Sequence, residues 1–194
     1  IRLLALDLDG TLLASDRTIP PRNREAVERA RDAGVHVVLA SGRNAPSVGR
    51  YAEEMGLVGP RVCCNGAHVM RSAAEELLHV RLDPALCRDV VEHARRERLH
   101  VHLYSRERLL FFGDDAWGDL YLSRLGGLRR ELLAGSVDDV EVTKLMIVAE
   151  PETIRLEAER FGTQECGTRA HLTLSEPEYL EFLPVKANKG AGLR

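Results

Sequence analysis

The chain has 194 residues, of which 44% are hydrophobic and 29% charged, and its formal net charge is −3. This balance is typical of a globular protein, and the net charge gives no sign of the basic surface that nucleic-acid binding needs. No apolar run is long enough to cross a bilayer, and we expect neither a nucleic-acid nor a membrane partner. The length allows one large domain or two small ones.

The cysteines and the first residues of the chain indicate its cellular compartment. Its four cysteines form no Cys-x-x-Cys pair, so we expect no zinc site built from cysteines. The opening apolar run is too short for a signal peptide and passes directly into acidic residues. We therefore expect reduced thiols in a cytoplasmic protein.

The first predicted element is a buried strand over 3–6, because a short apolar run ends there at a turn signal. Asp7 and Asp9 follow, and Gly10 permits a sharp turn. Residues two apart on an extended backbone point the same way, so the two carboxylates repel unless a cation offsets their charge. A hard divalent ion such as Mg²⁺ suits oxygen ligands of this kind. The alternative is a β-hairpin, since Asp-Gly between apolar runs is a strong hairpin signal.

The next elements decide between these alternatives. Helices are predicted over 22–33 and 44–55, and strands over 35–40 and 60–64. Strands that alternate with helices at this spacing predict βαβ units and a parallel sheet. Asp7, Ser41 and Asn65 each lie at or just after a strand end, where such sheets bind ligands. A hairpin gives no reason for this recurrence, so it becomes the minor alternative.

The pattern changes near Ser72, and the rest of the chain predicts a smaller α+β domain. Strands are expected over 77–82, 100–104, 109–112, 142–148, 170–174 and 179–183, and helices over 84–98, 117–125 and 151–161. The alternating faces predict a sheet that is covered on one side. His100 and His102 share a strand face, without an evident third metal ligand, and we expect a surface or partly buried pair. Residues 184–194 are predicted to be a loop that enters a helix.

Four segments of the chain together resemble sequence motifs of the haloacid-dehalogenase-like superfamily, and more narrowly of its Cof-like phosphatases. The first is Asp-Leu-Asp-Gly-Thr-Leu-Leu at 7–13, the second Ala-Ser-Gly-Arg at 40–43, and a further one Asn-Gly-Ala at 65–67. The third family motif is matched by Asn-Lys-Gly at 188–190, after Glu-Phe-Leu-Pro at 181–184. The resemblance covers the whole chain.

The resemblance implies an α/β fold, with a Rossmann-like parallel-sheet core into which an α+β cap domain is inserted. It assigns residues 1–74 and 181–194 to the phosphatase core and residues 75–180 to the cap, which selects the substrate. The family's fourth motif, which supplies a further Mg²⁺ ligand, is not present in the sequence. We therefore expect that the C-terminal part of the core follows Arg194.

The resemblance also implies roles for individual residues. Asp7 is the nucleophile, and Asp9 is the general acid and base. Mg²⁺ is held by the side chain of Asp7 and the backbone carbonyl of Asp9. The expected phosphate- and substrate-binding residues are Leu8, Thr11, Ser41, Gly42, Arg43, Asn65 and Lys189, of which Ser41 and Lys189 also count as catalytic. Lys186 competes with Lys189, which is favoured because Gly190 follows it.

The expected activity is Mg²⁺-dependent hydrolysis of small phosphorylated metabolites, sugar phosphates foremost, through an aspartyl-phosphate, by a monomer or homodimer. Two alternatives stay open. One is a phosphotransferase of the phosphomannomutase kind. The other is a non-catalytic module that binds phosphorylated ligands, if the chain truly ends at Arg194.

Overall fold

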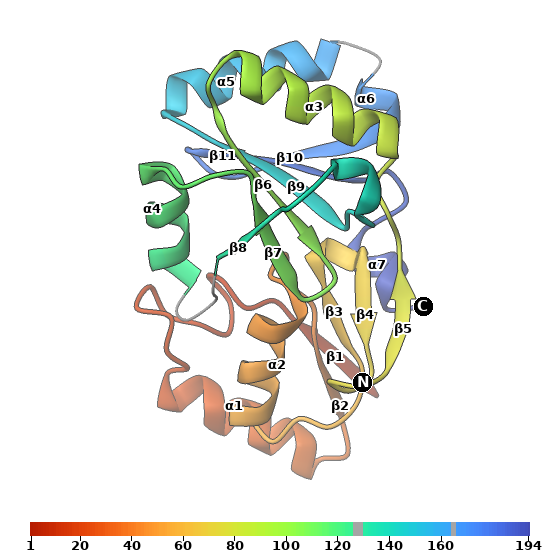
Figure 1. Cartoon of the computed structure of the whole chain (residues 1–194). Helices are drawn as coiled ribbons and strands as arrows, with labels where there is room; N and C mark the ends of the chain where they lie inside the picture. The colour runs from red at the N-terminus through yellow and green to blue at the C-terminus, as the bar shows by residue number, and fades with distance from the viewer. Residues whose placement is uncertain (126–129, 164–165) are drawn as a thin grey trace. The chain divides into compact units, whose positions relative to one another are not determined.

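The computed structural model describes residues 1–125, 130–163 and 166–194 of the chain. These residues form two compact units, one of residues 1–79 and 188–194 and the other of residues 80–187 (Figure 1). The chain passes from the first unit to the second after residue 79 and returns after residue 187. The sequence analysis expects these boundaries earlier, after residues 74 and 180. The strand over 179–184 pairs on both sides with strands of the second unit, so residues 181–187 group with that unit.

The first unit alternates strands and helices before it ends in short strands. Its elements are β1 (Leu3–Leu6), α1 (Pro21–Asp32), β2 (His36–Leu39), α2 (Ala45–Glu54), β3 (Arg61–Cys63), the 3₁₀ helix η1 (Cys64–Gly66), β4 (His68–Met70), β5 (Glu76–His79) and α7 (Lys189–Gly192). The predicted β-α-β-α-β order of its first part is confirmed. β4 was not predicted, because three residues carry too little periodicity to indicate a strand.

Parallel pairing of β1 with β2 rules out the hairpin alternative at Asp9-Gly10. The register joins Leu3 to His36 and Leu6 to Leu39. β3 continues this parallel arrangement through a single bridge between Ala40 and Val62. The chain then reverses at Cys64 and Asn65, whose φ angles are +47° and +52°. The reversal returns β4 antiparallel to β3, so an antiparallel sheet β3-β4-β5 follows the parallel pair.

Helices α1 and α2 contribute to one buried cluster with the strands and the loop after β1. Its buried members are Leu8, Leu12, Leu13, Ile19, Val27, Val37, Leu39, Ala45, Val48, Tyr51, Ala52, Met55, Cys63 and Met70. Leu8 and Val48 have no exposed surface. This packing holds the carboxyl ends of β1 and β2 in fixed positions, which is a condition for a precise site there.

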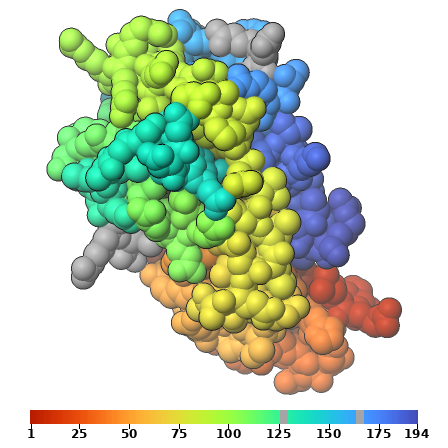
Figure 2. All heavy atoms as spheres, turned by 45° about the vertical axis from the view of Figure 1, so that its right-hand side comes forward, coloured from red at the N-terminus to blue at the C-terminus, as the bar shows by residue number. Residues whose placement is uncertain are grey.

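Part of the apolar surface of this unit is open to solvent. β5 is the edge strand of its sheet and lies on the surface, where Leu77 is 42% and Leu78 40% exposed (Figure 2). An apolar groove of about 340 Å³ is lined by residues that include Leu3, Val62 and Leu193.

The second unit contains a mixed sheet with helices. Its elements are α3 (Pro84–Arg96), β6 (His100–Ser105), β7 (Arg108–Phe111), α4 (Ala116–Leu125), β8 (Glu131–Leu132), the 3₁₀ helix η2 (Val137–Asp139), β9 (Lys144–Val148), α5 (Pro151–Thr163), α6 (Cys166–Arg169), β10 (Ala170–Glu176) and β11 (Tyr179–Pro184). The strand order is β10-β11-β9-β6-β7-β8. All neighbours are antiparallel except β7 and β8, which confirms the α+β character of this part.

The expectation that this sheet is covered on one side only is wrong. One face carries the larger core, in which Val90 of α3 and Ile154 of α5 pack against strand residues such as Ile147. The opposite face of β6, β7 and β9 packs against α4 around Tyr121. Every residue of β6 and β9 is buried as a result. The sequence did not reveal this because the second face carries polar residues, among them His102 and Lys144, beside its aromatic and aliphatic ones.

His100 and His102 lie on this second face, and both are buried rather than near the surface. His100 Nδ1 is 2.7 Å from an Asp115 carboxylate oxygen, and its Nε2 is 2.9 Å from His102 Nδ1. Burial lowers the pKa of His102 well below its ordinary value, and the neighbouring charges of His100 and Lys144 act in the same direction. His102 is therefore neutral, and the pair is part of the packing around Tyr121.

Asp83 caps α3, and we expect its removal to destabilise the protein measurably. Its carboxylate accepts a hydrogen bond from the backbone N–H of Leu86 at 3.0 Å and one from Arg169 at 3.1 Å. These bonds, that from Leu86 foremost, lower the pKa of Asp83. Asp83→Ala should cost about 1 kcal/mol of unfolding free energy near neutral pH, as loss of an N-cap does.

The pH dependence gives this prediction a second readout. Because the folded state lowers the pKa of Asp83, the carboxylate stabilises the fold above its unfolded-state pKa and loses this effect as the pH falls. Urea unfolding should thus show the difference between wild type and Asp83→Ala shrinking towards about pH 3. Glu92→Ala, at an exposed position of the same helix, is the control. An equal difference at both pH values would contradict the capping role.

None of the described helices is long and apolar enough to cross a membrane.

Candidate active site

The turn that follows β1 places Asp7 and Asp9 at the carboxyl end of the strand. Hydrogen bonds from Leu12 N to Asp7 O (3.2 Å) and from Leu13 N to Leu8 O (2.9 Å) close this turn. Gly10 has φ +69°, a left-handed conformation that glycine adopts without strain. The Leu8 side chain is completely buried and fixes the turn to the core.

Thr11 lies on the outer part of the same turn and is exposed. The amide of Asn23, in the first turn of α1, donates hydrogen bonds to the carbonyls of Thr11 and Leu12 at 3.2 and 3.0 Å. Asn23 was not among the predicted site residues. The one signal in the sequence was that asparagine is an unfavourable residue within a predicted helix, which indicates another role for Asn23.

Asp7 forms an ion pair with Lys189, although the two are 182 positions apart in the chain. Lys189 Nζ lies 2.8 Å from Asp7 Oδ2, and the side chains are 34% and 40% exposed respectively. The other carboxylate oxygen of Asp7 accepts a hydrogen bond from Leu8 N–H at 2.8 Å. Lys186, the competing lysine, lies in the second unit. Of the two lysines, Lys189 is the one that pairs with Asp7.

Two glycines allow Lys189 to reach Asp7. Gly66 has φ +94°, and a Cβ there would overlap the Asn188 carbonyl group, with the carbonyl carbon only 2.6 Å away. A Cβ on Gly192 would lie 2.8 Å from a methyl carbon of Val62. Asn188 caps α7 by accepting a hydrogen bond from Ala191 N–H at 2.8 Å. The Asn-Gly at 65–66 and the Asn-Lys-Gly at 188–190 are thus packed together.

Asp9 pairs with a different cation, Arg43. Arg43 Nε and Nη2 donate to the two carboxylate oxygens at 2.8 and 2.6 Å, a two-pronged geometry. The hydrogen bonds from Arg43 hold the pKa of Asp9 below its ordinary value, against the opposing effect of partial burial, and the charge of Arg17 also contributes. Each of the two acidic residues therefore has its own side-chain cation.

Ser41, Gly42 and Asn65 lie at the ends of β2 and β3. Ser41 is buried, and its hydroxyl accepts a hydrogen bond from Arg43 N–H at 3.2 Å. Asn65 N–H donates to the Ser41 carbonyl at 3.0 Å. The Asn65 amide lies against Gly42, where a Cβ would be 3.1 Å from its oxygen. Ser41, Gly42, Arg43 and Asn65 are thus neighbours, as expected from their positions after adjacent strands.

Tyr51 of α2 was not predicted to take part in this region. It is 1% exposed, and its hydroxyl donates to the Arg17 carbonyl at 3.0 Å. Arg50 donates to the same hydroxyl at 2.7 Å. The guanidinium carbons of Arg50 and Arg43 lie 4.7 and 5.4 Å from the ring centroid. Nothing in the sequence distinguishes this tyrosine from other core aromatic residues.

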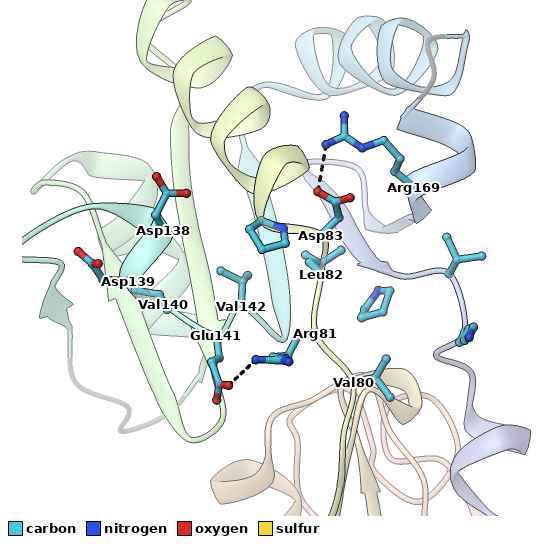
Figure 3. A pocket seen from close by; sticks show the side chains of 14 residues that line it. Val80, Arg81, Leu82, Asp83, Asp138, Asp139, Val140, Glu141, Val142 and Arg169 are labelled. Carbon is cyan, nitrogen blue, oxygen red and sulfur yellow. Dashed lines mark hydrogen bonds and ion pairs between the residues drawn. The ribbon is translucent and has the colours of Figure 1, made fainter.

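A separate cavity of about 570 Å³ lies in the second unit (Figure 3). Its charged side chains are largely paired with one another, as Arg81 with Glu141 at 2.6 Å and Arg169 with Asp83 at 3.1 Å. Of the candidate residues it contains only the competing lysine, Lys186. The chemistry that the motifs indicate is therefore concentrated in the first unit.

Metal-binding side chains are sparse in the described part of the chain, where no three His, Cys, Asp or Glu residues are grouped to hold an ion. Asp7 nevertheless offers an exposed carboxylate that already lies beside one cation. Mg²⁺ commonly binds through one or two protein oxygens, with water and substrate phosphate as its other ligands. The donor set of Asp7 and the Asp9 carbonyl fits such an ion.

Comparison with known proteins identifies the family. A family model described as haloacid dehalogenase-like hydrolase matches residues 4–194. The chain belongs to this family. The HMP-PP phosphatase of Shigella flexneri is 30% identical over an alignment of 201 positions, which covers 99% of this chain and 70% of that protein. The pyridoxal phosphate phosphatase of Escherichia coli is 30% identical over 111 residues, 57% of this chain but only 41% of that protein.

A solved structure agrees with the assignment to the haloacid dehalogenase-like family. A haloacid dehalogenase-like hydrolase from Bacteroides thetaiotaomicron matches with a TM-score of 0.85 and 25% identity. The match covers 99% of this chain and 74% of that structure. The resemblance inferred from the four motifs is confirmed at the level of family and fold.

Proposed function

We propose that the protein is a Mg²⁺-dependent phosphatase that hydrolyses phosphate monoesters of small metabolites, sugar phosphates among them. The observation that carries this proposal is the pair formed by Asp7 and Lys189 at the carboxyl end of β1. An exposed carboxylate beside an ammonium group can attack phosphorus while the cation balances the phosphoryl charge. The phosphatase activities in the names of the two relatives support the same reaction.

In the first step, an oxygen of the Asp7 carboxylate attacks phosphorus, and the bond from phosphorus to the leaving oxygen breaks. Asp9 gives a proton to the leaving oxygen. Lys189, Ser41 and the backbone N–H groups of Leu8 and Gly42 bind the phosphoryl oxygens, with Thr11 and Asn65 lining the site. The Asp7 side chain and the Asp9 carbonyl would hold Mg²⁺, whose positive charge would neutralise the phosphoryl group.

In the second step, water attacks the phosphorus of the aspartyl-phosphate, and the bond to Asp7 breaks. Asp9, now a carboxylate, takes the proton from the water and is again protonated for the next cycle. For this cycle, Arg43 must share its hydrogen bonds with the incoming phosphoryl anion, because its present bonds favour the ionised form of Asp9. We place Arg43 among the substrate-binding residues for this reason.

The second unit is proposed to be the cap that selects the substrate, and residues 1–79 with 188–194 part of the catalytic core. We further propose that the protein is cytoplasmic and acts as a monomer or homodimer.

Hydrolysis of p-nitrophenyl phosphate by the whole chain tests this proposal, and the metal dependence can be tested in the same assay. We expect phosphate release with Mg²⁺ and a loss of at least about tenfold on chelation with EDTA, restored by added Mg²⁺. Circular dichroism before and after chelation controls for unfolding. Activity that survives complete chelation would contradict the metal requirement. No release under any metal condition, while phosphate still binds, would favour the non-catalytic alternative.

A further inference from the structure

We propose that Arg17 and Arg50, which the Tyr51 hydroxyl links through the Arg17 carbonyl and the Arg50 guanidinium group, form a second anion-binding site that recognises a phosphate on the leaving group of the substrate. This inference rests on the proposed phosphatase function. It assigns Arg17 and Arg50 to the binding of substrates that carry two phosphates, diphosphate monoesters in particular.

Tyr51 is the fixed centre of this site. Its ring is buried, and its hydroxyl is fully used, donating to the Arg17 carbonyl at 3.0 Å and accepting from Arg50 at 2.7 Å. Arg50 also lies over the ring face, 4.7 Å from the centroid, which is a cation–π distance. The tyrosine therefore holds both the backbone of the loop at Arg17 and the guanidinium group of Arg50. This reduces the conformational entropy that an incoming anion would have to remove.

The positive charge at this place is only partly balanced, because the one carboxylate of Asp9 is paired with Arg43 and is also acted on by the charge of Arg17. Arg43 is neutralised by Asp9, but Arg17 and Arg50 form no ion pair with a carboxylate anywhere in the described ranges. The nearest acidic residue in sequence, Asp16, is bonded to the backbone and hydroxyl of Thr18. Glu54, one helical turn after Arg50, is paired with Arg24. Both guanidinium groups thus keep donors available for a ligand oxygen.

The location relative to the two acidic residues specifies which part of the substrate is bound. Arg43, which lies against the same ring as Arg50, is bonded to Asp9 and not to Asp7. In the proposed reaction Asp9 works at the leaving oxygen, whereas Asp7 and Lys189 hold the phosphoryl group that is transferred. Positive charge gathered on the Asp9 side therefore fits an anionic leaving group. Arginine is well suited to this role, because its planar donors match phosphate oxygens in pairs.

Matched substrates test this inference. Isopentenyl diphosphate and isopentenyl monophosphate share the same alkyl group, and glucose bisphosphate carries its second phosphate away from the reacting one. We expect wild type to prefer the diphosphate to the monophosphate in kcat/KM. Arg17→Ala and Arg50→Ala should each reduce this preference about tenfold, as loss of a charge-assisted hydrogen bond does. A higher kcat/KM for glucose bisphosphate than for isopentenyl diphosphate would contradict the assignment to diphosphate monoesters.

Controls separate this inference from the proposed function. Arg22→Ala removes one charge from an exposed position of α1 and should keep the wild-type preference. If the monophosphate is hydrolysed and neither arginine variant changes the preference, the second anion site is disproved while the phosphatase proposal stands. If neither substrate is hydrolysed, the affinities for inorganic pyrophosphate and phosphate, measured by calorimetric titration, still test the second anion site. Tighter binding of pyrophosphate that is lost in Arg50→Ala supports the site, and equal binding contradicts it.

Discussion

Asp7→Asn is expected to abolish phosphatase turnover, with kcat reduced by more than about a thousandfold, because the amide cannot serve as the nucleophile. The stability should change little. The pair of Asp7 with Lys189 is partly exposed, with side chains 40% and 34% accessible, and exposed ion pairs contribute about 0–1 kcal/mol. Steady-state kinetics with p-nitrophenyl phosphate and urea unfolding measure the two effects separately.

Asp32→Asn is the matched control for this variant. Asp32 is the last residue of α1 and is exposed. Its replacement by Asn removes the same charge from the first unit at a position without contact to the site. Its kcat should equal that of wild type. Substantial turnover by Asp7→Asn, with the fold intact and the control normal, would assign the nucleophile to another residue.

Gly66→Ala is expected to cause the largest combined loss of stability and activity. The new methyl group would overlap the Asn188 carbonyl, and the φ of +94° at this position is unfavourable for any residue with a Cβ. Overpacking and backbone strain together should cost about 2–4 kcal/mol of unfolding free energy. Relief of the overlap moves α7 away from η1, and Lys189 with it. The activity should therefore fall even at temperatures where the variant is fully folded.

Gly113→Ala separates this effect from a general effect of glycine replacement. A Cβ at Gly113 would have no atom within 4 Å, so this variant should match wild type in both measurements. Full activity of folded Gly66→Ala would show that Lys189 does not depend on the packing of η1 against α7. That outcome would weaken the role given to the ion pair with Asp7.

The local pattern of the sequence was sufficient to predict the parallel β1–α1–β2 unit and the polar residues at its strand ends. Asp7, Ser41 and Asn65 could be predicted together because short apolar strands and their turn residues are local signals. The resemblance added Lys189, whose approach to Asp7 depends on contacts between residues far apart in the chain. No local pattern contains that information.

Other features depend on packing that the sequence does not reveal. Tyr51 looks like any core residue of an amphipathic helix, and its link to Arg17 exists only in the folded chain. The second covered face of the sheet in residues 80–187 was missed because the alternation along the strands suggested a solvated side, although His100, His102 and Lys144 on that face are buried. The sequence pattern changes near Ser72, whereas β5 still pairs with β4 of the first unit, because β5 resembles any exposed strand until this pairing is known.

Trapping the phosphorylated enzyme tests the central claim most directly. Rapid acid quench during turnover, followed by peptide mass spectrometry, should find one phosphoryl group on the peptide that begins the chain, bound to Asp7 through an acyl linkage that hydroxylamine cleaves. Asp7→Asn treated in the same way should carry none. Phosphate release without any phosphorylated Asp7, or a phosphoryl group on another residue, would contradict the proposed mechanism.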